Sequence, residues 1–417
     1  MCYTHHASVT PFHHCAFPLP MIHRALTSGH WPSLLGAWLH FEVSFVVWLL
    51  IGALGIAIAR EFDLSATQKG ILVATPLLSG ALLRIVIGSW TDQFGAKRVG
   101  LGMLGIAMVA LLFAWLSGHS YPQMVGIGLL LGSAGASFAI ALPIASQAYP
   151  PHRQGLAMGI AATGNSGVIL ATWLAPRLAD QVGWHGVFGL MIVPVVLTAA
   201  VFAMVVHDRS LRKSACGGNG LADSFRVAFQ ERFMQCLCFF YAVTFGGFVG
   251  FSSFLPIFFH DQYDLDMVMA GAMTALCAFA GSLARPMGGY AADRGRGLRL
   301  LQGGLVGIGG LCMLLAWLPP PVWAVPLTMT TLLLLGFGNG VVFQVASLRY
   351  LDMMGTASGF IGAAGGLGGF FLPFWFGLFK DVTGTYASGF LVFAFLAMIA
   401  AGSVALVRRS MPVAEKQ

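Results

Sequence analysis

The stretch GALLRIVIGSWTD (residues 80–92) decides the fold, because its spacing returns 201 residues later as GSLARPMGGYAAD (residues 281–293). In both copies a glycine, an arginine, a second glycine and an aspartate fall at four-residue intervals, and the arginines are Arg84 and Arg285. Residues four apart are neighbours on a helix surface, so each copy predicts a helix that carries its arginine and aspartate on one stripe. The repeat therefore predicts a chain built from two related halves.

Each arginine lies eight residues before its aspartate, which is roughly 12 Å along a helix. If the aspartates mark the membrane surface, Arg84 and Arg285 reach the middle of a hydrocarbon core about 30 Å thick. An arginine at that depth costs at least ~2.5–3.5 kcal/mol on insertion scales, so it must face the protein interior or a cavity. Two arginines at matching depths favour one anion held between two halves.

The composition excludes an ordinary soluble domain, because 57% of the residues are hydrophobic and only 9% are charged. Apolar segments long enough to span a bilayer recur along the chain. We expect twelve of them, near residues 33–60, 70–92, 98–117, 121–148, 154–180, 184–206, 232–259, 267–293, 299–318, 321–348, 355–380 and 386–408. The prediction is an all-α membrane protein with twelve transmembrane helices.

The longest polar interruption, residues 207–231, divides these helices into six and six. Because the repeat relates helix 2 to helix 8, we expect two parallel, pseudo-symmetric six-helix bundles. The predicted organisation is a disordered tail (1–32), a first bundle (33–206), a cytoplasmic linker (207–231), a second bundle (232–408) and a short cytoplasmic tail (409–417).

Charge placement predicts the orientation. With the amino terminus inside, 16 of the 22 lysines and arginines fall on the cytoplasmic side and only Arg60, Lys69, Arg177 and Lys380 fall on the opposite side. The positive-inside rule then places both termini in the cytoplasm, and we expect a multi-pass protein of the cytoplasmic (inner) membrane. The net charge of +7 is accounted for by this topology, so we expect no nucleic-acid partner.

Metal, disulfide and enzyme chemistry are not expected. Six histidines with Cys2 and Cys15 in the first 30 residues are a candidate metal site, but we favour a disordered tail or an upstream start, with Met21 or a later residue as the beginning. The seven cysteines show no paired metal spacing, and we expect no structural disulfide. No phosphate-binding loop, nucleophile motif or histidine ligand pair occurs within the predicted spans, so we expect neither an enzyme nor a cofactor.

Helices 5 and 11 repeat a glycine pattern. Glycines in membrane helices allow close backbone approach, so packing alone would explain them. Their symmetric placement favours helices that slide against others around a central site. The glycines concerned are Gly159, Gly164 and Gly167 in helix 5 and Gly359, Gly365 and Gly368 in helix 11.

The sequence between helices 2 and 3 resembles the loop signature of the major facilitator superfamily. The matching residues are Gly88, Asp92, Gly95, Lys97 and Arg98. The resemblance implies a major facilitator fold and a cytoplasmic latch between helix ends. The second copy of the signature is degraded and retains Gly289, Asp293, Arg294 and Arg296; we include Asp293 and Arg294 in the latch.

Four further stretches resemble the nitrate/nitrite porter branch of that superfamily. They are the helix 5 glycines with Asn165, the helix 11 segment GFIGAAGGLGGFFLP (359–373), GFGNGVVFQ (336–344) and ARPMGGYAADR (284–294). The resemblance covers roughly residues 33–408. The sequence departs from the family pattern at two places. The helix 5 signature has Ser166 where the family commonly has a bulky residue, and the central loop is short.

The resemblance implies that Arg84 and Arg285 clamp the anion, with roles for Asn165, Phe138, Tyr241 and Phe245. A guanidinium suits a small flat oxyanion because it is planar, permanently charged and presents paired N–H donors. The Asn165 amide would donate to an anion oxygen, although a hydrogen bond between helices is an alternative. For each aromatic residue, core packing is the alternative to lining the site.

Glu42 is the one carboxylate that we place well inside a span, near His40. A buried carboxylate is costly unless it is paired or protonated. Glu42 either neutralises an arginine as a structural ion pair or, with His40, carries a proton during symport. Both readings stay open.

We expect a carrier that moves nitrate, nitrite or both by alternating access, through proton symport or nitrate/nitrite exchange, and that functions as a monomer among membrane lipids. One alternative is a facilitator-type carrier for another small oxyanion or an organic anion. Another is a membrane sensor that binds an anion without moving it, which would not need the symmetric glycine helices or the latch.

Overall fold

The computed structural model describes residues 29–150, 154–207, 230–292, 296–350 and 354–410. In these segments the secondary structure is helical, and eleven helical stretches are long and apolar enough to cross a membrane. In lipid a backbone has to satisfy its own hydrogen bonds, and an α-helix does so within one segment. Most of the predicted amino-terminal tail and of the linker lies outside the described residues.

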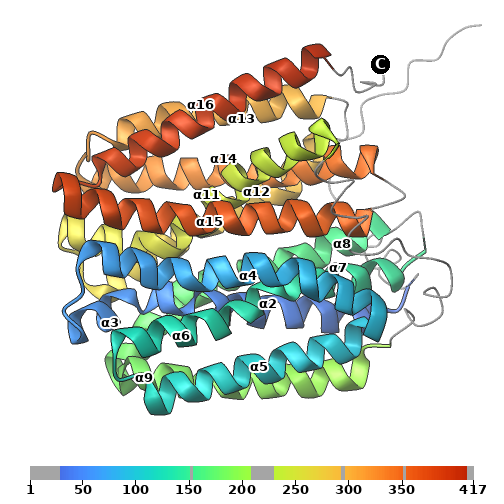
Figure 1. Ribbon diagram of the computed structural model, residues 1–417, viewed down its shortest axis with the longest axis horizontal. Helices are drawn as coiled ribbons and strands as arrows, with labels where there is room; N and C mark the ends of the chain where they lie inside the picture. Colours follow the sequence, from blue (N-terminus) through green and yellow to red (C-terminus); the bar gives the residue numbers. More distant parts are fainter. Residues whose placement is uncertain (1–28, 151–153, 208–229, 293–295, 351–353, 411–417) are drawn as a thin grey trace, which may run out of the picture.

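The helices pack side by side in one elongated bundle (Figure 1). The first half contains α2 (Trp31–Ala53), α3 (Gly55–Glu61), α4 (Ala66–Phe94), α5 (Ala96–Ser117), α6 (Tyr121–Leu131), α7 (Phe138–Gln147), α8 (Gln154–Ala162) and α9 (Gly167–Val205). The second half contains α11 (Arg232–Tyr263), α12 (Met267–Ala291), α13 (Gly297–Leu315), α14 (Pro321–Arg349), α15 (Met354–Thr383) and α16 (Ala387–Ser410). These bounds differ from the predicted spans by only a few residues.

The eleven stretches contain twelve membrane-crossing helices, because α9 bends within its length and contributes parts of two of them. At Gly183 the backbone has φ 74° and ψ 158°, so the residues before it form helix 5 and those after it form helix 6. Glycine adopts this positive φ without a steric penalty. Helices 4 and 5 also contain short 3₁₀ turns, at Gly132–Ser137 and Thr163–Ser166. The predicted fold of twelve helices in two six-helix halves is confirmed.

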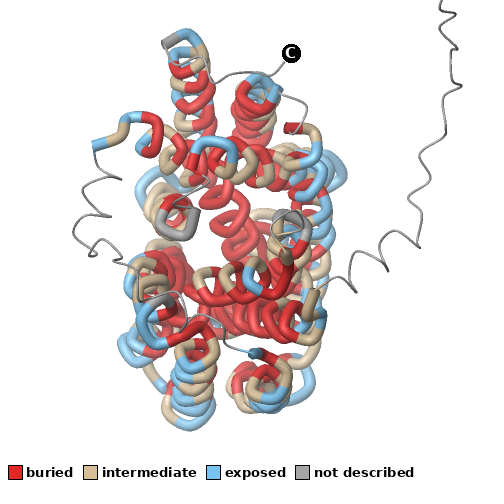
Figure 2. Tube along the Cα trace, turned by 90° about the vertical axis from the view of Figure 1, so that its right-hand side faces the viewer, coloured by how far each residue is buried: buried red, intermediate tan, exposed pale blue. Residues whose placement is uncertain are grey.

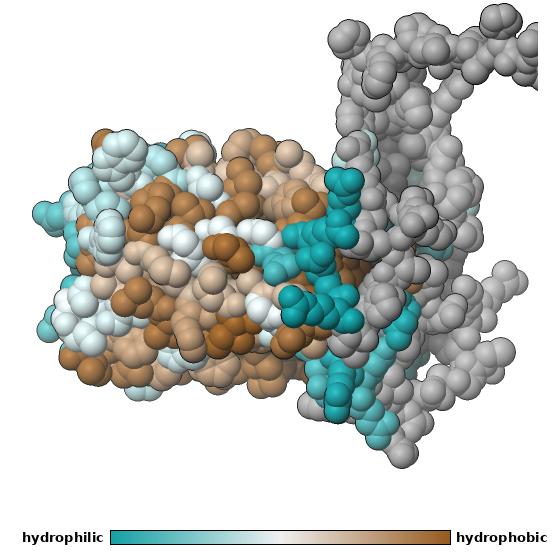
Figure 3. Space-filling model, turned by 90° about the horizontal axis from the view of Figure 1, so that it is seen from above, coloured by the Kyte–Doolittle hydropathy of each residue, from teal (hydrophilic) through white to brown (hydrophobic). Residues whose placement is uncertain are grey.

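The bundle has two ends, which we name by their connections. The terminal face is the end where α2 begins and α16 ends, at the right of Figure 1, and the far face is the opposite end. A brown hydrophobic surface separates hydrophilic residues at the two ends in Figure 3, as expected for a protein that spans a bilayer. The buried residues gather where the two halves meet, and the exposed ones lie outside (Figure 2). The assignment of the terminal face to the cytoplasm stays a prediction.

Helices α4 and α15 form a close contact between the halves. A Cβ atom on Gly70 would lie 2.5 Å from the Pro373 carbonyl oxygen, and one on Gly366 would lie 2.7 Å from the Ala81 Cβ. In contrast, a Cβ on Gly88 near the terminal face would have open space around it. The halves therefore pack tightly from the centre to the far face.

The six glycines of helix 5 (α8 and the first part of α9) and helix 11 (α15) fall into two groups, packed and unpacked, and the grouping is the same in both halves. Gly164 and Gly167 pack against α2, and Gly365 and Gly368 pack against α11. Gly159 and Gly359, nearer the terminal face, have open space beside them. Sliding of these helices stays a prediction, for which this space leaves room.

We expect Gly336→Ala to destabilise the second half, because its new Cβ would lie 2.8 Å from the Gly281 Cα atom. Such overpacking costs about 1–3 kcal/mol. The thermal midpoint of the purified protein should fall by several degrees. Gly310→Ala is the control, since nothing lies within 4 Å of the added atom; an equal fall in both variants would contradict the packing argument.

Candidate functional site

Arg84, in the middle of α4, is buried and held by one carbonyl from each half. Its side chain is 2% exposed. Its Nε donates to the Gly135 carbonyl at 2.9 Å, in the 3₁₀ turn of helix 4, and its Nη1 donates to the Gly362 carbonyl of α15 at 2.6 Å. The Nη2 group has no partner.

Arg285 occupies the corresponding position on α12 and is 7% exposed. Its Nη2 lies 3.4 Å from the Tyr241 hydroxyl, and its Nη1 has no partner. Neither arginine forms an ion pair with a carboxylate in the part of the chain that the structure describes. A buried donor without a partner costs about 1–3 kcal/mol, so these two N–H groups are candidate donors to a bound ligand.

Aromatic rings surround the two guanidinium groups. The Phe138 ring centre lies 6.0 Å from the Cζ of Arg84 and 5.8 Å from the Cζ of Arg285. Phe245 lies 5.2 Å from Arg84 and stacks on Tyr241 with a centroid distance of 4.9 Å. Aromatic faces attract cations, which offsets part of the hydration that burial removes. The structure therefore brings the predicted arginines and aromatic residues together.

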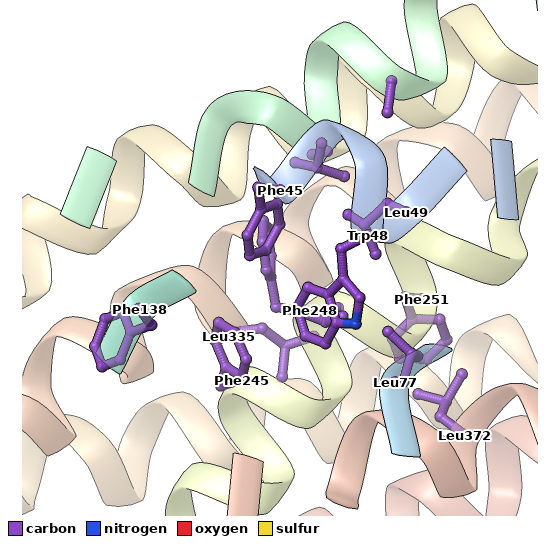
Figure 4. Packing of buried hydrophobic residues seen from close by; sticks show 14 of the residues in the cluster. Phe45, Trp48, Leu49, Leu77, Phe138, Phe245, Phe248, Phe251, Leu335 and Leu372 are labelled. Atoms are coloured by element: carbon purple, nitrogen blue, oxygen red, sulfur yellow. The ribbon is translucent and has the colours of Figure 1, made fainter. Parts of the chain in front are cut away.

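Two residues of this aromatic shell were missed by the sequence analysis. The Trp48 ring lies 5.1 Å from the Arg84 Cζ, and the Phe343 ring lies 5.9 Å from the Arg285 Cζ. Figure 4 shows Trp48 and Phe245 in the buried cluster. The spacing of Phe41, Phe45 and Trp48 places three rings on one face of α2, a signal that would have pointed to Trp48.

Two asparagines are buried in the described structure. Asn165, in the 3₁₀ turn of helix 5, is 1% exposed and its Oδ1 has no partner. Asn339 is fully buried, and neither atom of its amide has a partner. It lies one helical turn from Phe343, whose ring centre is 5.0 Å from that of Tyr241, and one turn from Leu335, which lies against Gly247 of α11. Asn339 therefore shares a stripe of α14 with Phe343; its clue in the sequence is that the chain has only three asparagines.

Glu42 does not neutralise either arginine. It is 6% exposed, and its Oε2 accepts a hydrogen bond from the Ser166 hydroxyl at 2.8 Å. The small residue that departs from the family pattern at position 166 thus supplies the partner of this carboxylate. Among the described residues Glu42 has no ion pair.

His40 lies apart from Glu42. Two residues along a helix correspond to roughly 200° of rotation, so the side chains leave α2 on opposite sides. The His40 Nε2 lies 3.2 Å from the Gly100 carbonyl oxygen, and its ring lies 4.8 Å from the Phe202 ring. The structure does not bring the two candidate proton-coupling residues together.

The predicted latch is described only in part. Gly88 lies in α4, Gly95 joins α4 to α5 with φ 91°, and Lys97 and Arg98 lie in the first turn of α5. Asp293 and Arg294 lie outside the described residues, and the side chain of Asp92 is not described. The latch stays a prediction.

The chain is similar to known transporters over most of its length. Residues 37–373 match the model of the Major Facilitator Superfamily. It is 35% identical over 391 residues to a probable nitrate/nitrite transporter, NarK2, of Mycobacterium tuberculosis, covering 92% of this chain and 97% of that protein. It is 31% identical to a nitrite extrusion protein of Bacillus subtilis, covering 86% of this chain and 90% of that protein.

A solved structure supports the fold. A bacterial homolog of the human lysosomal transporter Spinster superposes with a TM-score of 0.67, at 19% identity, over 91% of this chain and 97% of that chain. At that identity the likeness concerns the arrangement of helices alone.

We expect Asn339→Leu to stabilise the empty protein, because it replaces two unpartnered polar atoms by an apolar side chain of similar size. The thermal midpoint should rise by a few degrees. A lower midpoint would show that the amide is bonded in the folded protein, for example by a buried water molecule. Leu335→Ala, one turn away, is the control for packing and should lower the midpoint.

Proposed function

This chain belongs to the major facilitator superfamily and, within it, to the nitrate/nitrite porters, and we propose from this premise that it carries nitrate, nitrite or both across its membrane by alternating access. It is a transporter and not an enzyme. The observation that carries the proposal is the pair of buried arginines, each with an unpartnered N–H group and, among the described residues, neither with a carboxylate partner.

The site suits a small flat anion. The free donors Arg84 Nη2 and Arg285 Nη1 belong to different halves, so one anion can bind both halves. Nitrate and nitrite stay ionised at cellular pH, and a planar guanidinium matches their paired oxygens. The ring of Phe138 lies within 6.0 Å of both guanidinium carbons. This spacing favours a thin ligand among the aromatic rings that surround the arginines. A bulkier organic anion would require these rings to move, and it remains the second candidate.

The packing supports alternating access from a state closed at the far face. The halves touch closely at Gly70 and Gly366, whereas Gly159 and Gly359 have open space beside them. Rocking of one half against the other would bring the halves together at the terminal face and separate the far-face contacts. The central arginines would stay near the pivot.

Charge balance supports a coupled cycle. Two guanidinium groups and one monovalent anion leave a net positive charge in the centre. An empty carrier with two such charges resists reorientation, and exchange of nitrate for nitrite would keep the site occupied. Proton entry with the anion is the other route, and Glu42 is a buried carboxylate available for it because no cation in the described part of the chain pairs with it.

The proposal is tested by uptake of labelled nitrate into proteoliposomes of the purified protein. Arg84→Lys and Arg285→Lys keep the charge but lose the paired donors, and we expect each to reduce uptake at least tenfold, about 1.4 kcal/mol. Arg177→Lys is the matched control, because Arg177 bonds the Trp173 carbonyl of its own helix, and it should transport normally. Uptake that survives in both central variants would refute the clamp, and its absence in the parent would favour another anion.

Glu42→Gln separates the two coupling schemes. It keeps an acceptor for Ser166 but cannot release a proton, so uptake driven by external acid should be lost. Nitrate uptake against nitrite trapped inside the vesicles should persist. Loss of both activities would mean that Glu42 serves the structure and not proton coupling.

A further inference from the structure

Two carboxylates of the second half hold the first turn of one helix of the first half. Asp381, near the end of α15, accepts hydrogen bonds from the Ala66 N–H at 3.1 Å and the Thr67 N–H at 2.8 Å. Its Oδ2 also accepts from the Ser65 hydroxyl at 3.0 Å. These contacts close the far face between α15 and α4.

The first turn of α4 has backbone N–H groups that can donate to the Asp381 carboxylate. A helix begins with backbone N–H groups that have no partner inside the helix. The Ser65 hydroxyl accepts from the Gln68 N–H, and the Gln68 side chain accepts from the Ser65 N–H. The N–H groups of Ala66 and Thr67 remain, and Asp381 takes both. A negative group at this end also interacts favourably with the helix dipole.

The second carboxylate lies one turn along α4. The Lys69 ammonium lies 2.8 Å from the Asp261 Oδ2, and the same oxygen accepts from the buried Tyr386 hydroxyl at 2.9 Å. Lys69 belongs to the first half, and Asp261 and Tyr386 belong to the second. Close by, the Arg60 Nη2 donates to the His260 Nε2 at 3.1 Å.

We propose that Asp381 and Asp261 form a far-face lock on residues 65–69, and that this lock sets how often the carrier opens to the far side. The lock rests on the proposed function only in assuming that the halves rock. Opening the far face has to break three hydrogen bonds of Asp381 and the ion pair of Asp261. Every one of these contacts involves a charged group, so raised ionic strength should weaken the lock.

The other half carries a matched aspartate that makes no such lock. Asp180 lies 201 residues before Asp381, at the corresponding end of helix 5. In the described structure it takes no hydrogen bond from α12, whose start is capped instead by Asp266 at 2.9 Å from the Met269 N–H. In the 201-residue repeat Asp266 corresponds to Ser65 of α4. Because Asp266 is itself a carboxylate, it would repel a second carboxylate at the start of α12. Of the two matched helix starts on the far face, the start of α4 therefore has this lock and the start of α12 does not.

The lock is tested by the labelling of single cysteines in detergent, without nitrate or nitrite. Ser253→Cys reports the far side, because Ser253 is 2% exposed and its backbone contacts Gly52 across the halves. Gly359→Cys reports the terminal side, where there is open space. The labelling of the parent with its seven native cysteines is subtracted.

We expect Asp381→Ala to raise the labelling rate of Cys at position 253 about tenfold and to lower that at position 359. Asp381→Asn keeps an acceptor and should give a smaller rise, and raised salt should act in the same direction on the parent. Asp180→Ala is the matched control and should leave both rates unchanged. An unchanged rate at position 253 in Asp381→Ala would overturn the lock, and so would a rise at both positions, because that pattern indicates local unfolding.

The outcome is independent of the transported anion. Labelling without substrate reports only the closure of the far face, whereas uptake through the arginines reports the clamp. A failed lock with normal nitrate uptake refutes the lock alone, and a working lock without nitrate uptake refutes the substrate alone.

Discussion

Two positive charges buried without a carboxylate are the constraint on which the rest of the structure depends. Arg84 is tolerated because two carbonyls and three aromatic rings take the place of water. Arg285 has rings and one weak contact with a hydroxyl. Each still has one N–H group without a partner among the described residues. In the proposed clamp a bound anion would reduce the repulsion and satisfy both donors, so anion binding should stabilise the protein.

The pseudo-symmetry supplies paired sites, and departures from it give the halves different tasks. The arginines correspond across the repeat, yet Arg84 bonds both halves whereas Arg285 contacts Tyr241 of its own half. The far-face aspartates correspond too, yet only Asp381 caps a helix of the other half. The axis that relates two parallel halves runs along the membrane normal, so the repeat pairs the two contacts between the halves within one face and does not make the two faces equivalent. These differences make the two contacts unequal, because among the described residues Asp381 bonds the start of α4 whereas Asp180 takes no such bond from α12.

Helix positions and the arginine pair could be predicted from the sequence because both are local or periodic. Apolar runs mark the spans, and the four-residue spacing aligns Arg84 with its aspartate on one stripe. The partner of Glu42 could not be predicted in this way, because Ser166 is 124 residues away and only the packing of α2 on helix 5 joins them. The roles of Trp48 and Phe343 likewise depend on which helices meet. His40 was grouped with Glu42 by closeness in sequence, and the helix turns the two side chains apart.

The contact between Arg84 and the Gly362 carbonyl has a consequence for the timing of the cycle. If Arg84 binds the anion as proposed, the five N–H donors of one guanidinium are shared between the anion and the neighbouring half. An anion that draws Arg84 toward itself competes with that carbonyl and loosens α15. Substrate would then lower the barrier to its own transport, so that a carrier with a bound anion changes conformation faster than one without.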